Sequence, residues 1–408
     1  YVDFANWLLE QRGHGYGTKG DNSNWDKSYY QDEVPVSEME SIGGHAVRCM
    51  YLYCGMADVA AIKHNPQYID ALNRLWTDVV ERNMYITGGI GSSRHNEGFT
   101  EDYDLPNLEA YCETCASVGM VLWNHRMNQF TGDSKYIDVL ERSMYNGALA
   151  GISLNGDRFF YVNPLESKGD HHRLPWYGCA CCPSQLSRFL PSIGNYIYGI
   201  SDNAIWVNLY IGNVAEVNVD GVQVTMKEET KYPWNGRIKF TINADEEINK
   251  ELRLRIPGWC KKYNLFINGK ESLKKLRIDK GYVVIADWNS GDNIELDFDM
   301  PDVEVVKSDA RVKQNIGKRA IQRGPLVYCI EDAQNKDTIE GIYISPKTSF
   351  KTDFNVNLLN GVQQITAKDG KKTFTLIPYY AWDNMEAGSM KVWIDYEKIV
   401  KFPCGVIV

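Results

Sequence analysis

The chain lacks the features that mark nucleic-acid binding, membrane insertion or export. Its 408 residues carry 44 basic and 53 acidic side chains, a net charge of −9, with no basic tract. This balance argues against nucleic acids and anionic membranes as partners. No apolar run approaches the roughly 18 residues of a membrane span. No signal-peptide pattern is present, and Tyr1 already lies in a helical pattern, so we expect the chain to be cut at its N-terminus.

The chain also has no need of disulfides, because 408 residues can bury a large core. Five of its ten cysteines stand apart among mostly apolar neighbours, and we expect them to be buried small hydrophobic residues: Cys49, Cys54, Cys260, Cys329 and Cys404. The other five form two clusters, Cys112-Glu113-Thr114-Cys115 and Cys179-Ala180-Cys181-Cys182-Pro183. Adjacent cysteines do not easily pair with each other. The clusters therefore indicate a metal site, a thiolate nucleophile, or both.

Spacing alone leaves the choice of metal ligands open. Cys112 and Cys115 are three residues apart and would share one helix face, so spacing slightly favours them together with two of the later cysteines. Glu113 and Cys115 are two apart and could act together only from an extended or irregular segment, joined by Cys181 and Cys182. A thioredoxin-like redox role is a third interpretation, but no βαβ pattern surrounds the cluster. A zinc ion that only staples helices also fits this spacing.

Short motifs before and after these clusters narrow the choice. They are Ile86-Thr87-Gly88-Gly89-Ile90-Gly91, Asn96-Glu97-Gly98-Phe99, Tyr103-Asp104-Leu105-Pro106-Asn107, Glu113-Thr114-Cys115-Ala116-Ser117 and Cys179-Ala180-Cys181-Cys182-Pro183. Further matches are Gly44-His45-Ala46-Val47-Arg48, Tyr161-Val162-Asn163-Pro164-Leu165 and Gln322-Arg323-Gly324-Pro325-Leu326. In this order, across nearly the whole chain, the sequence resembles glycoside hydrolase family 127, the β-L-arabinofuranosidases that use a cysteine nucleophile.

The resemblance implies a set of roles. Zinc would be bound by four residues that match the family's ligands, Glu113, Cys115, Cys181 and Cys182, with Cys181 also matching the nucleophile. Glu97 matches the general acid/base, although Asn96 and Gly98 depart from the usual motif around it. His45 and Tyr161 match substrate contacts. Trp176 and Tyr177 could form a stacking wall for a sugar ring.

The expected function is therefore that of a retaining glycoside hydrolase releasing β-L-arabinofuranose from plant glycans or glycoproteins. One alternative is a related glycosidase acting on another pectin-derived furanoside. A second is a non-catalytic carbohydrate-binding protein with a structural zinc. The partner would be a carbohydrate substrate, and a homodimer is compatible with the sequence. Reduced thiolates favour a reducing compartment, such as a bacterial cytoplasm.

Hydrophobic periodicity divides the chain near residue 200. Before it, helical patterns cover 3–12, 38–63, 67–84, 109–131, 133–150 and 183–198, with Ser37 and Asp133 as expected caps and Gly132 and Gly199 at expected helix ends. After it, alternation predicts strands at 204–210, 222–226, 237–242 and 251–256. Asn268-Gly269 and Asp369-Gly370 predict turns.

These patterns predict three units: a helical catalytic unit at 1–200, a β-sandwich at 201–302, and a second β-rich, sandwich-like module at 303–408. The resembling family has an (α/α)6 barrel followed by two β-sandwich modules. Six helical patterns are about half of such a barrel, so we expect an α + β multidomain chain that holds its C-terminal half.

Overall fold

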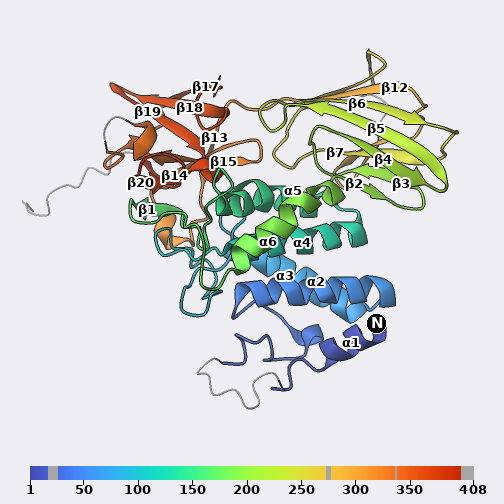
Figure 1. Cartoon of the computed structure of the whole chain (residues 1–408), viewed down its shortest axis with the longest axis horizontal. Coiled ribbons are helices and arrows are strands. Elements are labelled where there is room, and N and C mark those ends of the chain that lie inside the picture. The colour runs from blue at the N-terminus through green and yellow to red at the C-terminus, as the bar shows by residue number, and fades with distance from the viewer. Residues whose placement is uncertain (17–25, 273–276, 336–337, 397–408) are drawn as a thin grey trace, which may run out of the picture.

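The computed structural model describes residues 1–16, 26–272, 277–335 and 338–396; Cys404 lies outside this range. The chain begins with helices and continues into sheets, and the helical part lies beneath two sheet-rich parts (Figure 1). The α-helices are α1 (Val2–Glu10), α2 (Ala46–Lys63), α3 (Pro66–Asp78), α4 (Thr114–Thr131), α5 (Ser134–Arg142) and α6 (Cys181–Phe189). Single π or 3-10 turns extend α3, α5 and α6 to Asn83, Ala148 and Tyr196.

Helix termini follow local capping chemistry, with two departures from prediction. Asp133 caps α5 by accepting from the Lys135 N–H at 3.0 Å, and Gly132 ends α4 in the left-handed conformation, as predicted. Ser37 is not the cap of α2: it lies in a 3-10 turn, and His45 is the cap residue. Gly199, predicted to end a helix, lies instead in a strand, because the preceding helix has already ended in a 3-10 turn.

The helical core is centred on the contact between α2 and α4. A Cβ on Gly119 would lie 2.6 Å from the Met50 Cβ, so the glycine lets the two helix backbones approach closely. Trp123, one turn further along α4, is completely buried against Tyr53 of α2. Truncating a buried tryptophan to alanine costs roughly 3–5 kcal/mol, so Trp123 contributes strongly to holding α4 against α2.

The middle part is a pair of sheets that share one apolar core. A five-stranded sheet has the order β10-β11-β7-β3-β2 and a six-stranded sheet the order β4-β5-β6-β12-β8-β9. Their strands are β2 (Tyr198–Ile200), β3 (Ala204–Val207), β4 (Asn213–Val219), β5 (Val222–Thr230), β6 (Arg237–Ala244), β7 (Glu251–Arg255), β8 (Tyr263–Ile267), β9 (Lys270–Glu271), β10 (Arg277–Asp279), β11 (Tyr282–Ile285) and β12 (Asp292–Phe298). The four predicted strands coincide with β3, β5, β6 and β7. The predicted turn at Asn268-Gly269 joins β8 to β9, with both residues at positive φ.

The last part is a ten-stranded sheet with one strand borrowed from the helical part. It contains β1 (Glu166–Lys168), β13 (Glu304–Lys307), β14 (Lys318–Arg323), β15 (Leu326–Glu331), β16 (Tyr343–Ile344), β17 (Ser349–Asn355), β18 (Val362–Asp369), β19 (Lys372–Pro378), β20 (Ser389–Lys391) and β21 (Ile394–Tyr396). The predicted Asp369-Gly370 turn joins β18 to β19. β1 pairs antiparallel with β20, so the chain that leads to α6 is anchored on the C-terminal sheet.

A buried ion network joins the helical part to the middle sheets. Arg255 of β7 is fully buried, and its guanidinium contacts Asp138 and Glu141 of α5, each at 2.7 Å. The Tyr232 hydroxyl donates to Glu141 at 2.9 Å. Burial opposes the guanidinium charge, but Glu141 and Asp138 more than compensate and raise the pKa of Arg255. The buried Arg255 guanidinium is therefore shared by two carboxylates, and Glu141 has both a cation and a hydroxyl as partners within the protein.

A second joint connects the helical part to the C-terminal sheet. Arg173 is buried over the Phe160 ring at 4.2 Å, and burial lowers its pKa to about 10. Its guanidinium donates to the carbonyl of Ala150 at 2.8 Å, and to carbonyls of the segment 380–383 that precedes β20. Together with the β1–β20 pairing, these bonds fix the segment between β1 and α6 against the C-terminal sheet.

The architecture is thus α + β and multidomain, with helices first and two sheet-rich parts after them. Closure of the helices into an (α/α)6 barrel and the unit boundaries at 200 and 302 stay predictions. No helix among the described residues is both long enough and apolar enough to cross a membrane.

Candidate active and metal site

Three thiols and one carboxylate converge at the ends of two helices. One potential ligand atom from each of Glu113, Cys115, Cys181 and Cys182 lies within 4.8 Å of the others. Glu113 Oε1 is 3.5 Å from the Cys181 Sγ and 3.6 Å from the Cys182 Sγ, and the sulfurs of Cys115 and Cys182 are 3.5 Å apart. The structure therefore brings together the four residues that match the family's ligands.

The local backbone explains how Glu113 and Cys115 reach the same point although they are two residues apart. Glu113 is the cap residue of α4 and is extended (φ −58°, ψ 136°), whereas Cys115 already lies in the first helical turn. The Thr114 N–H donates to the Tyr161 carbonyl at 3.0 Å, and Glu113 forms a β-bridge with Val162. The ligand pair favoured by spacing, Cys112 with Cys115, assumed a continuous helix, and no such helix exists here.

Cys112 and Cys179 lie outside the cluster. Cys112 has a positive φ of 38° and is buried facing Gly89, where a Cβ would contact its sulfur at 3.1 Å. Cys179 is exposed. Of the isolated cysteines, Cys49, Cys54 and Cys329 are buried as predicted, while Cys260 is only half-buried.

Two helix N-termini contribute to the electrostatics of the thiols. Cys181 and Cys182 are the first two residues of α6, and Cys115 is the second residue of α4. Exposed backbone N–H groups at such termini favour anions. Hydrogen bonds from Cys115 and Cys182, and a further one from Tyr161, lower the pKa of Cys181, whereas the pKa values of Cys115 and Cys182 are raised. Negative charge is therefore best stabilised on Cys181.

The carboxylate of Glu113 is incompletely satisfied by the protein. Burial raises its pKa to about 8, with the nearby Cys181 as the second cause. Its Oε2 atom is buried and has no hydrogen-bond partner among the described residues. A buried carboxylate oxygen without a partner is costly, so this arrangement suits a cation held between the carboxylate and the three sulfurs.

Glu97 and His45 form a pair beside the cluster. The His45 Nε2 lies 3.3 Å from Glu97 Oε2, and potential ligand atoms of His45, Glu97 and Glu113 lie within 4.8 Å of one another. The His45 Nδ1 accepts from the Val47 N–H at 3.2 Å, which leaves the proton of a neutral ring on Nε2, directed at Glu97. Burial lowers the pKa of His45, although Glu97 opposes the shift, so the ring is neutral near pH 7.

The turn that carries Glu97 packs against the start of α2. Glu97 itself has a positive φ of 51°, and its carbonyl accepts from the Ala46 N–H at 3.1 Å. Gly98 is required here, since a Cβ would lie 1.8 Å from the Gly44 carbonyl oxygen. The Asn96 side chain closes the turn by donating to the Phe99 carbonyl at 2.8 Å. These residues, which depart from the family motif, thus build a defined turn in this chain.

Tyr161 contacts the cluster directly. Its hydroxyl lies 3.1 Å from the Cys181 Sγ, and burial together with Cys181 raises the pKa of Tyr161. The Tyr177 hydroxyl donates to the Phe159 carbonyl at 2.9 Å and accepts from the Tyr161 N–H at 3.1 Å, so Tyr177 supports the segment that carries Tyr161. Trp176 is mostly exposed and packs on Phe159. The two residues expected to form a stacking wall therefore make different contacts.

Two residues near the cluster gained no role from the sequence. Asn163 donates to the Cys112 carbonyl at 2.8 Å and to the Thr114 hydroxyl at 2.9 Å, which fixes the start of α4. Tyr111 lies close enough to Glu113 and Glu97 that burial and these two carboxylates raise its pKa. The only sequence feature that could have pointed to Asn163 is its place in the motif at 161–165. For Tyr111 the only such feature is that it precedes Cys112 in the chain.

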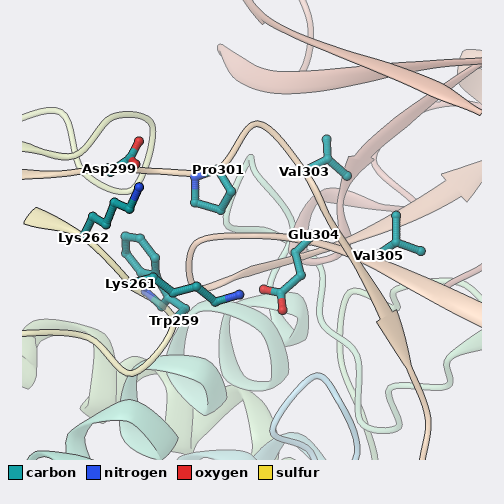
Figure 2. Close-up of a pocket in the computed structure, with 8 residues that line it drawn as sticks. All are labelled: Trp259, Lys261, Lys262, Asp299, Pro301, Val303, Glu304 and Val305. Atoms are coloured by element: carbon teal, nitrogen blue, oxygen red, sulfur yellow. The ribbon is translucent and has the colours of Figure 1, made fainter.

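A separate cavity of about 410 Å³ lies at the junction of the two sheet-rich parts. Figure 2 shows the Trp259 ring beside Pro301, with Lys261, Lys262 and Glu304 around it. None of the residues of the thiol cluster lines this cavity, so it is not part of the candidate active site.

Comparisons with known proteins agree along the chain. Family models for the β-L-arabinofuranosidase GH127 catalytic domain, the GH127 middle domain and the glycoside hydrolase family 127 C-terminal domain match residues 1–195, 204–300 and 303–395. A non-reducing end β-L-arabinofuranosidase of Bifidobacterium longum subsp. longum is 33% identical, over 96% of this chain and 67% of that protein.

Solved structures give the same result. A GH127 β-L-arabinofuranosidase from Geobacillus stearothermophilus T6 is 38% identical with a TM-score of 0.91, over 97% of this chain and 69% of the other. A further GH127 β-arabinofuranosidase is 40% identical with a TM-score of 0.90, over 97% of this chain and 66% of the other. Because three family models and relatives above 30% identity agree over nearly the whole chain, this chain belongs to glycoside hydrolase family 127.

Proposed function

We propose that this chain is a retaining glycoside hydrolase that releases β-L-arabinofuranose from plant glycans or glycoproteins, with Cys181 as nucleophile and Glu97 as acid/base. The observation that carries the proposal is the convergence of the Cys181 thiol, favoured as thiolate by its neighbours, with a Glu97–His45 pair that shares Glu113 as a neighbour. The sugar is supported by the names of the relatives.

The reaction would proceed in two displacements. The Cys181 thiolate attacks the anomeric carbon, a C–S bond forms, and the bond to the leaving oxygen breaks as that oxygen takes the proton of Glu97. Water then attacks the same carbon and gives its proton to Glu97, and the C–S bond breaks to return the electron pair to Cys181. Two inversions give net retention.

The neighbouring side chains tune these groups. The Nε2 proton of neutral His45 lies toward Glu97 and would orient its carboxyl group. The Tyr161 hydroxyl, 3.1 Å from the Cys181 sulfur, would donate to the thiolate before attack and again as the C–S bond breaks. His45 and Tyr161 would also contact the sugar, as the family match implies.

We further propose that Glu113, Cys115, Cys181 and Cys182 hold one zinc ion. Three sulfurs and one carboxylate are a donor set that zinc accepts, and the unpartnered Glu113 Oε2 supports a cation there. When bound, such an ion would supply positive charge that stabilises a thiolate.

The domain plan also remains our proposal. The helical part would be half of an (α/α)6 barrel, and the boundaries near 200 and 302 are supported by family matches ending or starting at 195, 204, 300 and 303.

The decisive experiment is hydrolysis of a panel of aryl furanosides, with β-L-arabinofuranoside included, followed by NMR of the first-formed product. We expect β-L-arabinofuranose, released with retention. Glu97→Gln should lower turnover by roughly 10²–10⁴ on poor leaving groups and by less on activated aryl groups, which need little protonation. Preference for another furanoside would change the substrate. Absence of turnover in protein that carries zinc would instead favour the non-catalytic, structural-zinc alternative.

A further inference from the structure

A second cavity, of about 370 Å³, lies between the C-terminal end of α4 and the five-stranded sheet. It shares no lining residue with the thiol cluster. Cys115 and Asn128 lie on the same helix, 13 residues apart by their numbers, which places them about 20 Å apart along its axis at 1.5 Å per residue. The cavity is therefore separate from the candidate active site.

A buried chain of three polar side chains forms one wall of this cavity. The Tyr282 hydroxyl accepts from Asn128 Nδ2 at 3.0 Å and donates to Asn208 Oδ1 at 2.8 Å. Asn128 Nδ2 also donates a hydrogen bond to the Asp133 carbonyl at 3.0 Å. All three side chains belong to buried residues, and both asparagines line the cavity.

This chain leaves hydrogen-bonding capacity on the cavity side. Within the described part of the chain, no partner accepts from the Asn208 amide N–H groups, and none donates to the Asn128 Oδ1. Asn208 is 2% exposed and Asn128 4% exposed, so water has little access except through the cavity. Both atoms are accessible from the cavity, so the Asn208 amide nitrogen can donate there, and the Asn128 Oδ1 can accept, to a ligand or to water.

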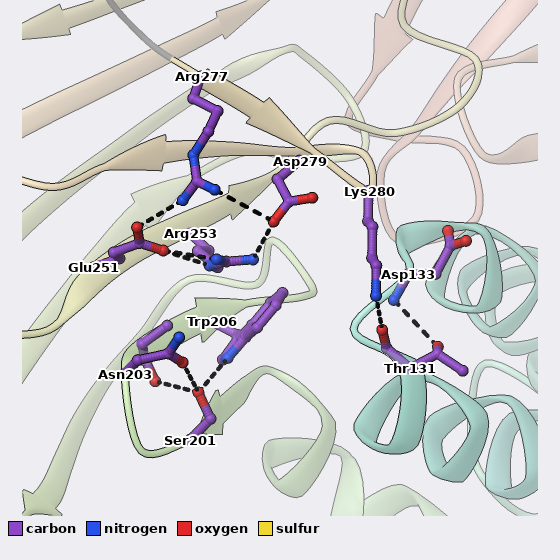
Figure 3. Close-up of polar contacts among 11 residues, drawn as sticks. Thr131, Asp133, Ser201, Asn203, Trp206, Glu251, Arg253, Arg277, Asp279 and Lys280 are labelled. Atoms are coloured by element: carbon purple, nitrogen blue, oxygen red, sulfur yellow. Dashed lines mark hydrogen bonds and ion pairs between the residues drawn. The ribbon is translucent and has the colours of Figure 1, made fainter.

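The remaining wall is aromatic, and its arginine is paired with carboxylates within the protein. Trp206 is half-buried, with the Arg253 guanidinium 4.4 Å from its ring centroid and its Nε1 donating to the Ser201 hydroxyl at 3.1 Å (Figure 3). Arg253 is paired with Glu251 at 2.7 Å and Asp279 at 3.0 Å.

The other two basic side chains of the lining are Lys280 and His125. Lys280 Nζ donates to the Thr131 carbonyl at 2.6 Å (Figure 3). Burial lowers the pKa of His125 to about 4, so this lining residue is neutral near pH 7. Among the described lining residues, Lys280 is thus the one cation without a carboxylate partner, and it is exposed to solvent. Titration with sulfate therefore tests whether the cavity binds an anion instead.

We propose that this cavity is a second, non-catalytic binding site for a neutral sugar residue. A sugar hydroxyl both donates and accepts, so it matches the free donor of Asn208 and the free acceptor of Asn128. The part of the Trp206 indole that lines the cavity, and that Arg253 and Tyr282 do not cover, offers an apolar contact for the sugar ring. The volume lies within the roughly 300–1,000 Å³ typical of small-molecule sites. The inference goes beyond the proposed function and does not depend on it.

The structure offers a variant that blocks the cavity without removing a bond. A Cβ on Gly199 of β2 would lie 3.6 Å from the Trp206 Cβ and 3.8 Å from Asn208 Nδ2, which is ordinary van der Waals contact. Gly199→Val should therefore fold and cover the Asn208 donor. Gly212→Val is the matched control, since its Cβ would lie 3.7 Å from the nearest atom, the Glu228 carbonyl oxygen, and Gly212 does not line the cavity.

The experiment uses the full chain labelled with 5-fluorotryptophan, with the Trp206 ¹⁹F resonance assigned from Trp206→Phe. D-glucose, L-arabinose and sodium sulfate are titrated separately. We expect a saturable shift of the Trp206 resonance with at least one sugar and none with sulfate. The affinity should fall at least about tenfold in Gly199→Val and stay unchanged in Gly212→Val.

Asn208→Asp provides a second, independent variant, because it keeps the acceptor for Tyr282 and removes the free donor. The sugar affinity should fall about two- to tenfold, the usual range for one neutral hydrogen bond. Three results would overturn the proposal. They are a Trp206 resonance that does not shift with either sugar, a shift with sulfate alone, and equal sugar affinity in folded Gly199→Val and wild-type protein. Turnover of aryl furanosides is measured on the same samples, so loss of either property is seen separately.

Discussion

Glu113 and Glu141 are both buried glutamates of the helical part, yet their surroundings differ. Glu141 is 1% exposed and pairs with the Arg255 guanidinium at 2.7 Å and the Tyr232 hydroxyl at 2.9 Å. Glu113 is 2% exposed, is surrounded by thiols, and keeps one oxygen without a partner. The first carboxylate is neutralised by the fold, whereas the second is not.

This difference indicates that Glu141 serves the stability of the fold, whereas Glu113 serves the chemistry of the candidate site. A complete network such as that of Glu141 holds two units together and has no capacity left for a ligand. An incomplete network such as that of Glu113 costs stability and persists where something else completes it. The variants below test whether these two glutamate environments serve stability and catalysis separately.

The largest expected effect is on catalysis at the incomplete site. Cys181→Ala should lower kcat/KM by at least about 10⁴-fold on aryl β-L-arabinofuranosides, because the nucleophile is lost. Cys179→Ser, which alters an exposed cysteine two residues earlier, is the control and should keep full activity. Comparable losses in both variants would mean that the segment, and not the Cys181 thiol, is what matters.

The next effect is on stability at the complete network. Arg255→Leu leaves Glu141 and Asp138 without their cation and should lower the free energy of unfolding by about 3–5 kcal/mol, measured by urea denaturation. Activity per folded molecule should stay close to wild type. If activity is lost while stability is unchanged, the contrast between the two glutamates is wrong.

A smaller effect is expected from the Tyr161 hydroxyl beside the thiol cluster. Tyr161→Phe removes a hydrogen bond to the Cys181 thiolate, which is worth roughly 1.5–3 kcal/mol for a charged acceptor and predicts a 10- to 100-fold loss in kcat/KM. The pKa of Cys181, read from the pH dependence of its alkylation by iodoacetamide, should rise. Tyr177→Phe should leave that profile in place, because its hydroxyl contacts only backbone.

The smallest effect concerns a third buried glutamate, which lacks a cation. Burial raises the pKa of Glu228 to about 8 from its ordinary value of 4.5. Between these values unfolding releases a proton, so this group makes stability fall as pH rises, with the full penalty above about pH 8. Glu228→Gln should raise the Tm by about 2–4 °C at pH 8.5 and leave it nearly unchanged at pH 4.5, measured by calorimetry. Equal shifts at both pH values would contradict this assignment.

Local chemistry let the sequence predict much of the fold. Asp133 caps a helix through its own side chain, and Gly132 ends one through its own backbone, so both helix ends could be predicted from the residue type. Strands such as β6 bury one face, so their alternating pattern could also be predicted from the sequence. The start of α2 was not. Ser37 looked like a cap, but Gly44 at φ 67° packs its backbone against Ser28, which delays the helix to His45.

The candidate site was readable only with the help of the family motifs. Spacing favoured Cys112 as a ligand because it assumes a continuous helix. The positive φ of Cys112 and the extended backbone of Glu113 break that helix, and they are set by contacts to Asn163 and Val162, which are distant in the sequence. The resemblance pointed to the four residues that converge. The second cavity left no signal in the sequence, because Asn128, Asn208 and Tyr282 come from three separate elements.

The joint between β1, Arg173 and the segment 380–391 has a consequence for the timing of biosynthesis. The stretch that leads into Cys181 is anchored by carbonyls and a strand made more than 200 residues later in the chain. At about 5–20 residues per second, a ribosome needs roughly 10–40 s to add them. During that interval the thiols are synthesised but their segment is not yet anchored, so a nascent chain would hold its cysteines open to oxidation until residues 380–391 have been made.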